Sequence, residues 1–248
     1  IEIAKLLNHT EKLDSYNTTK SRIQIGIKKW FTHYQLHQNE KEFKLKSAQS
    51  ILNSDLIHIL CGNYPLQIFE PNDPIVTNLL KMIETQHTVE SIFYSSQHPH
   101  GFNTSQNCQL AQVYAQKKNP KAFNILKWLT QSASSTGCWP ESIHPISKGG
   151  AAGDGHFAQT NAEYILLIRN LLIQEKNKNL HILQFIPPDW LSENNQEIKM
   201  RNTQTHFGPI DITIKRLNSI IHLDITPHFH TCPLELIINI PFPIHKMK

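Results

Sequence analysis

A long loop without regular periodicity carries most of the residues in this sequence that could do chemistry. It runs from Ser132 to Gly155 and holds five of the nine glycines of the chain. Glycine-rich backbone can approach a ligand closely, and a loop of this length inside a compact domain is functional or disordered. Two carboxylates, two histidines and a tryptophan in or just after the loop are the candidate site residues: Trp139, Glu141, His144, Asp154 and His156.

Two carboxylates held in one pocket suit the hydrolysis of glycosidic bonds, because one can act as an acid while the other acts as a base or nucleophile. Glu141 and Asp154 are therefore the predicted catalytic residues. Trp139, His144 and His156 would bind the substrate, the tryptophan offering an apolar face to a sugar ring. A structural interpretation is equally open, in which Asp154 and His156 cap the following helix and Glu141 binds loop amides.

The elements around the loop are predicted from hydrophobic periodicity. Apolar residues recur at helical spacing from residue 1 to about 131 and predict about six helices, and a further helix follows the loop over 156–175. One helix should begin after Asn119-Pro120, because proline suits the first helical position. Its predicted apolar face consists of Ala122, Ile125, Leu126 and Leu129. Beyond Asn177 the pattern changes to short alternating runs, which are typical of strands. They cover four segments: 180–185, 210–214, 220–225 and 234–240.

Several motifs together resemble a known family. They are WPESIHP at 139–145, GDGH at 153–156, the pair Ala162-Glu163, and PPDW at 187–190. This series is similar to the last hairpin and tail of six-hairpin glycosidase-like proteins, in which the central motif reads near GDGHHGWAAAE. Phe157 stands where the second histidine of that motif is usual, and Gln159 stands where an aromatic residue is common.

The resemblance implies a mainly α fold: a partial (α/α) toroid of helical hairpins over 1–176, followed by a small antiparallel β tail over 177–248. It also implies a sugar-binding cavity at one end and an inverting glycoside hydrolase-like mechanism, with Glu141 preferred as the base. The chain has room for fewer hairpins than a complete toroid, so it would be the C-terminal part of one. The alternative is a non-catalytic module that binds a glycan or a partner chain.

Composition excludes other classes of function. The net charge is only +4, and the 24 basic residues are spread along the chain, so no nucleic-acid partner is expected. No apolar run is long enough for a membrane span. The four cysteines lack CxxC spacing, and the pairs His98/His100 and His228/His230 are weak signals, so neither metal nor cofactor is predicted. The expected partners are an oligosaccharide or polysaccharide, and a dimer contact or a missing N-terminal portion.

Overall fold

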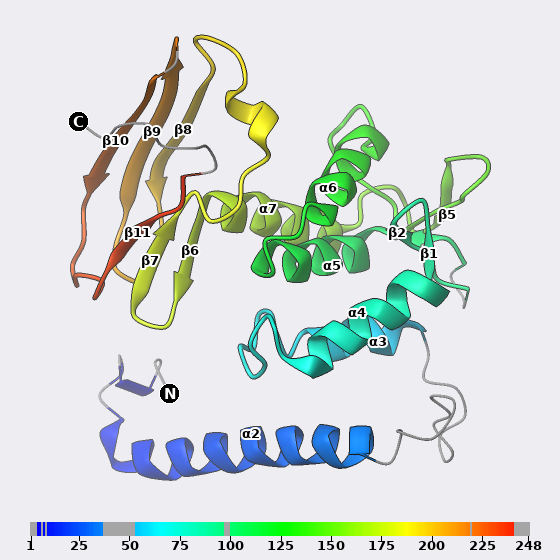
Figure 1. Ribbon diagram of the computed structural model, residues 1–248, viewed down its shortest axis with the longest axis horizontal. Coiled ribbons are helices and arrows are strands. Elements are labelled where there is room, and N and C mark those ends of the chain that lie inside the picture. Colours follow the sequence, from blue (N-terminus) through cyan, green and yellow to red (C-terminus); the bar gives the residue numbers. More distant parts are fainter. Residues whose placement is uncertain are drawn as a thin grey trace. The chain divides into compact units, whose positions relative to one another are not determined.

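The computed structural model (Figure 1) describes residues 4, 5, 7, 9–36, 53–96, 100–218 and 220–240. Contacts between residues divide the chain into two compact units, Ile1–Gln86 and His87–Lys248. Which segments fold on their own, the predicted 1–176 and 177–248 among them, stays a prediction. No helix in the described ranges is both long and apolar enough to cross a membrane.

The first unit consists of helices. They are η1 (Thr10–Lys12), α2 (Leu13–Leu36), α3 (Asn53–Leu60) and α4 (Pro74–Gln86). Helix α4 begins at Pro74, because proline suits a first helical position and Asp73 Oδ1 accepts a hydrogen bond from the Ile75 N–H at 2.9 Å. Its buried residues recur at helical spacing on one face. They are Ile75, Val76, Leu79, Leu80 and Ile83.

Three helices form the first part of the second unit. They are α5 (Thr104–Gln116), α6 (Lys121–Ser132) and α7 (Ala158–Leu172). Helix α5 packs against both α6 and α7, and Asn103 caps its start by accepting a hydrogen bond from the Gln106 N–H at 2.9 Å. The helix expected after Asn119-Pro120 is confirmed, and its buried face is the predicted one. That face consists of Ala122, Ile125, Leu126 and Leu129.

Very short strands accompany these helices. The strands β1 (Thr88–Val89) and β2 (Ile92–Phe93) pair as a hairpin. A three-stranded antiparallel sheet is made by β3 (Phe102–Asn103), β4 (Ser142–Ile143) and β5 (Gly150–Ala152). Because β4 and β5 lie inside the glycine-rich loop, this sheet joins the loop to the segment just before α5.

Two larger sheets close the second unit. One has the order β11-β7-β6 and contains β6 (Ile173–Lys176), β7 (Asn179–Ile182) and β11 (Leu236–Ile238). The other has the order β10-β9-β8 and contains β8 (Glu197–Thr203), β9 (Ile210–Leu217) and β10 (Ile220–Pro227). The short helix η2 (Pro188–Leu191) lies between β7 and β8 in the sequence. Both sheets contribute aliphatic residues to one buried cluster, among them Ile173, Leu180, Ile182, Ile210, Ile212 and Ile214.

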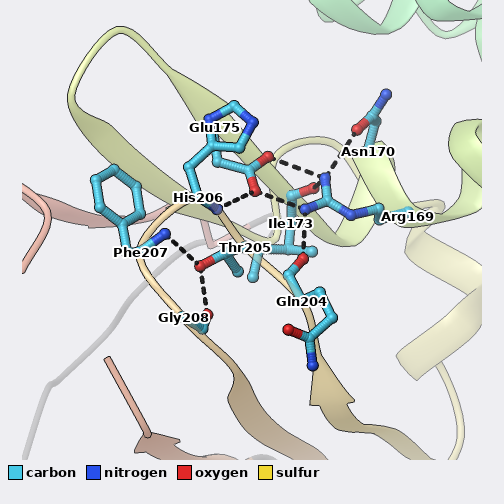
Figure 2. A network of polar contacts seen from close by, with 9 residues as sticks. All are labelled: Arg169, Asn170, Ile173, Glu175, Gln204, Thr205, His206, Phe207 and Gly208. Atoms are coloured by element: carbon cyan, nitrogen blue, oxygen red, sulfur yellow. Dashed lines mark hydrogen bonds and ion pairs between the residues drawn. The ribbon is translucent and has the colours of Figure 1, made fainter. Parts of the chain in front are cut away.

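An ion pair at the junction of α7 and β6 ties a distant loop to this region (Figure 2). Arg169 donates two hydrogen bonds to the Glu175 carboxylate, from Nη2 to Oε1 at 2.6 Å and from Nη1 to Oε2 at 3.0 Å. The same guanidinium donates to the Gln204 carbonyl at 2.9 Å, and Glu175 accepts from the His206 N–H at 3.2 Å. The loop between β8 and β9 is therefore held to α7 and β6 by charge-assisted bonds.

The prediction of a mainly α toroid with an antiparallel β tail is wrong. Strands form four small sheets in the described part of the chain, and strands alternate with helices from Thr88 onward. The last strand, β11, pairs with β7 in parallel, so the final sheet is mixed. Strands of two or three residues are too short to show a period of two. The partners of β3 and β11 also lie far away in the sequence, where local patterning carries no information.

Candidate functional site

An open cavity of about 720 Å³ lies between the C-terminal end of α6 and the glycine-rich loop. From α6 and the residues just after it come Trp128, Gln131, Ser132, Ala133 and Ser134. The loop contributes Pro140, Ile143, Lys148, Gly150, Gly153, Asp154 and Gly155. Among the five predicted site residues, Asp154 is the one that lines this cavity.

The first part of the loop is fixed to the N-terminal ends of two helices. The Thr104 N–H donates to the Glu141 carbonyl at 3.0 Å, and the Thr104 hydroxyl donates to the Pro140 carbonyl at 2.7 Å. On the other side, the Phe157 N–H donates to the Trp139 carbonyl at 2.8 Å. These bonds position the backbone that forms one wall of the cavity. The loop is thus a structural element held by backbone hydrogen bonds to α5 and to the segment just before α7.

Trp139 is an anchor of the loop and lies away from the cavity surface. Its side chain is only 3% exposed, and its ring centroid lies 4.8 Å from that of Tyr164 on α7. The indole Nε1–H donates to the Leu129 carbonyl near the end of α6 at 2.9 Å. A buried tryptophan with a satisfied N–H is typical of a structural role.

Trp128 takes the place at the cavity that the sequence suggested for Trp139. It is half-buried, and its ring meets the Phe102 ring edge-on, with centroids 5.6 Å apart. Sequence reasoning missed this residue. One feature of the sequence could have identified it. Trp128 lies on α6 outside the predicted apolar face, so its ring is not needed for the helix core and is available at the surface.

The two predicted catalytic carboxylates occupy neighbouring backbone segments and have different surroundings. Asp154 is exposed at the cavity, and its Oδ1 accepts a hydrogen bond from the His156 N–H at 2.9 Å. Asp154 does not cap α7, because the N-cap position of that helix is Phe157. Glu141 is half-buried and does not line the cavity.

Gly153 allows these two segments to approach. Its φ is +82°, and a Cβ placed there would lie 2.8 Å from the Glu141 nitrogen. Any other residue would be strained by this backbone conformation and would collide with Glu141. The glycine therefore permits the contact beside Asp154. Glu141 directly precedes β4 and Asp154 follows β5, so the two residues flank this pair of strands.

The two predicted substrate-binding histidines serve the loop itself. His144 is exposed, and its Nδ1 accepts hydrogen bonds from the N–H groups of Ile146 at 3.3 Å and Ser147 at 3.2 Å. His156 is also exposed, with its Nε2 3.4 Å from the Thr136 hydroxyl. Neither histidine lines the cavity.

Lys148 supplies a positive charge at the cavity. Its Nζ lies 5.6 Å from the centroid of the Phe102 ring, within the range of a cation–π contact. The cavity thus combines an aromatic edge, one ammonium, one carboxylate and several amide or hydroxyl groups. In the described ranges, no cluster of three or more histidine, cysteine or acidic side chains could hold a metal ion. His98, part of one weak metal signal, lies outside those ranges.

Comparisons of the chain with family models, with curated proteins and with solved structures found no match. The similarity of the motifs around Trp139 and Asp154 to six-hairpin glycosidase-like proteins therefore stays a prediction, as do the predicted partners. What the cavity can bind has to be argued from its own side chains.

Proposed function

We propose that this chain binds carbohydrate in the cavity between α6 and the glycine-rich loop. The observation that carries the proposal is that Trp128 and Asp154 line one cavity. A sugar ring presents C–H groups on its faces and hydroxyl groups around its edge, so an aromatic ring and a carboxylate recognise complementary parts of it. Gln131, Ser132 and Ser134 add hydrogen-bonding groups. A volume of about 720 Å³ lies within the usual range for small-molecule sites.

Substitutions at the cavity test this proposal. We expect Trp128→Leu and Asp154→Asn each to weaken the binding of an oligosaccharide about tenfold, which corresponds to about 1.4 kcal/mol. The measurement is calorimetric titration against a panel of neutral and acidic oligosaccharides. Leucine keeps apolar bulk against Phe102 but removes the aromatic face, so Trp128→Leu should remain folded.

The matched control is Asp189→Asn, which removes an exposed carboxylate on η2 outside the cavity lining. Its affinity should equal that of the unaltered chain. Equal affinities for all four proteins would contradict the proposal, as would the absence of binding to any member of the panel.

A second candidate function is the hydrolysis of glycosidic bonds. The close approach of Gly153 to Glu141 favours it, because the contact brings a second carboxylate-bearing segment next to Asp154. In this scheme Asp154 protonates the leaving oxygen, and Glu141, which does not line the cavity, must turn its carboxylate toward the cavity to act as the base that activates water. Hydrolysis requires that carbohydrate binds in the same cavity, so this function adds bond cleavage to the binding proposed first.

Release of reducing sugar from the glycans that bind distinguishes the two functions. We expect Glu141→Gln to lower the rate at least 100-fold, in the range of a lost general base, while the affinity for the glycan changes little. Asp189→Asn again serves as the control. A Glu141→Gln variant with full activity would remove Glu141 from this role, and binding without any release would leave the binding function alone.

A further inference from the structure

One face of the β6–β7 hairpin gathers three buried polar atoms that have no partner among the described residues. They are Gln174 Oε1, Asn179 Oδ1 and His181 Nδ1. Gln174 lies directly opposite His181 in the strand register, and Lys176 lies opposite Asn179. Because side chains alternate between the two faces of a strand, all four side chains share one face. The other face carries Ile173, Leu180 and Ile182, which are fully buried in the aliphatic cluster.

The chemistry of these atoms is that of acceptors. Asn179 Nδ2 donates to Glu235 Oε2 at 2.8 Å, which orients the amide and leaves Oδ1 as the free acceptor. Gln174 Oε1 is an acceptor on a side chain that is only 3% exposed. Burial first, and then the charges of Lys176 and Lys118, lower the pKa of His181. Its imidazole is therefore neutral at pH 7, and Nδ1 accepts a hydrogen bond in the tautomer that carries the proton on Nε2.

The charged groups near His181 limit which kind of ligand can bind to the three acceptor atoms. An anion would place negative charge beside three lone pairs, so it does not fit. The positive charges of Lys118 and Lys176 act on His181 more strongly than the negative charge of Glu235, so a metal ion or an organic cation is disfavoured. Lys118 Nζ is held close to the hairpin by a hydrogen bond of 3.1 Å to Asn239 Oδ1, just beyond β11. What remains is a small uncharged molecule that donates hydrogen bonds.

We propose that this face of the β6–β7 hairpin is an internal hydration site, in which at least two ordered water molecules donate hydrogen bonds to Gln174, His181 and Asn179. Buried water typically makes about three hydrogen bonds to polar groups that would otherwise lack a partner. The water links the strands β6 and β7 through their side chains, in addition to their backbone ladder. It is part of the fold of the second unit and is independent of the carbohydrate cavity.

A high-resolution crystal structure of the unaltered chain tests the site directly. We expect electron density for water about 2.7–3.2 Å from Gln174 Oε1 and from His181 Nδ1. Side chains that turn to form a direct hydrogen bond between Gln174 and His181, with no density between them, would overturn the proposal.

Thermal unfolding supplies an independent test, in which the direction of the change in melting temperature decides the outcome. In Gln174→Met the bound water would lose a partner, so we expect the melting temperature to fall by about 4 °C. The double variant Gln174→Met/His181→Phe should expel the water and recover part of that loss. The control Gln159→Met makes the same change at an exposed position on α7 and should have no effect. A rise in melting temperature for Gln174→Met would mean that the site is dry, and would overturn the proposal.

Discussion

Replacing Arg169 with methionine is expected to lower the free energy of unfolding by about 3 kcal/mol, as is typical when one partner of a buried ion pair is removed. The Glu175 side chain is only 9% exposed, and Arg169 is its only ion-pair partner among the described residues. After the substitution the largely buried carboxylate would lose both hydrogen bonds from Arg169 and keep the one from the His206 N–H. The Gln204 carbonyl would lose its donor as well. Urea unfolding followed by circular dichroism measures the loss.

An exposed ion pair provides the control for Arg169. Lys199 and Glu197 lie 2.7 Å apart on β8, with side chains 46% and 31% exposed. Since water screens such a pair, Glu197→Gln should change the stability by less than about 0.5 kcal/mol. Equal effects of Arg169→Met and Glu197→Gln would contradict the view that burial makes the Arg169–Glu175 pair important.

The same ion pair makes the effect of Arg169 depend on pH. Burial alone raises the pKa of Glu175, but the hydrogen bonds and charge of Arg169 outweigh it, and the pKa lies below its ordinary value of 4.5. A carboxyl with a lowered folded-state pKa stabilises the fold above the unfolded value, and this stability is lost as pH falls through the folded value. The difference between the unaltered chain and Arg169→Met should therefore be large at pH 7 and shrink below about pH 4.

Long periodic elements could be predicted from this sequence, and short paired ones could not. The helix after Asn119-Pro120 was predicted with the correct buried face, because both the proline signal and the apolar spacing are local. The helix after the loop was predicted over 156–175, but it ends at Leu172 and Ile173 begins a strand. Ile173 continues the apolar pattern in either conformation, so periodicity cannot place the change.

The motifs led to a wrong prediction of the architecture, because they carry no information on how distant segments pair. The motifs WPESIHP and GDGH approach each other at Glu141 and Gly153. The pairing of Phe102 with Ile143 and of Leu236 with Leu180 sets the sheets, however, and neither pairing leaves a local pattern. A helix-rich N-terminal sequence was therefore extended into a toroid, when the second unit combines helices with four small sheets.

The location of the candidate site was more predictable than the roles of its residues. Residue types and glycine content marked the loop, and Asp154 does line the cavity. Which of two tryptophans faces the cavity depends on tertiary contacts. Trp139 is buried by Tyr164 and bonded to Leu129, whereas Trp128 stands at the cavity edge. Spacing along the chain cannot separate these two cases.

Truncation of Trp139 should have the largest effect on stability of the changes considered. We expect Trp139→Ala to cost about 3–5 kcal/mol, as for other buried aromatic residues, because the ring fills the space between α6 and α7 and is 3% exposed. Trp139→Phe should cost about 1 kcal/mol, since it keeps an aromatic ring but removes the donor to the Leu129 carbonyl. Urea unfolding of both variants measures these values.

Trp128→Leu is the matched comparison, because it changes a second tryptophan, which lines the cavity. We expect it to weaken glycan binding with a small loss of stability, while Trp139→Phe lowers stability and leaves the affinity of the folded protein unchanged. If Trp139→Phe instead weakened binding at unchanged stability, its ring would be facing the sugar, as the sequence alone suggested. The anchoring role that its burial and its bond to Leu129 indicate would then be wrong.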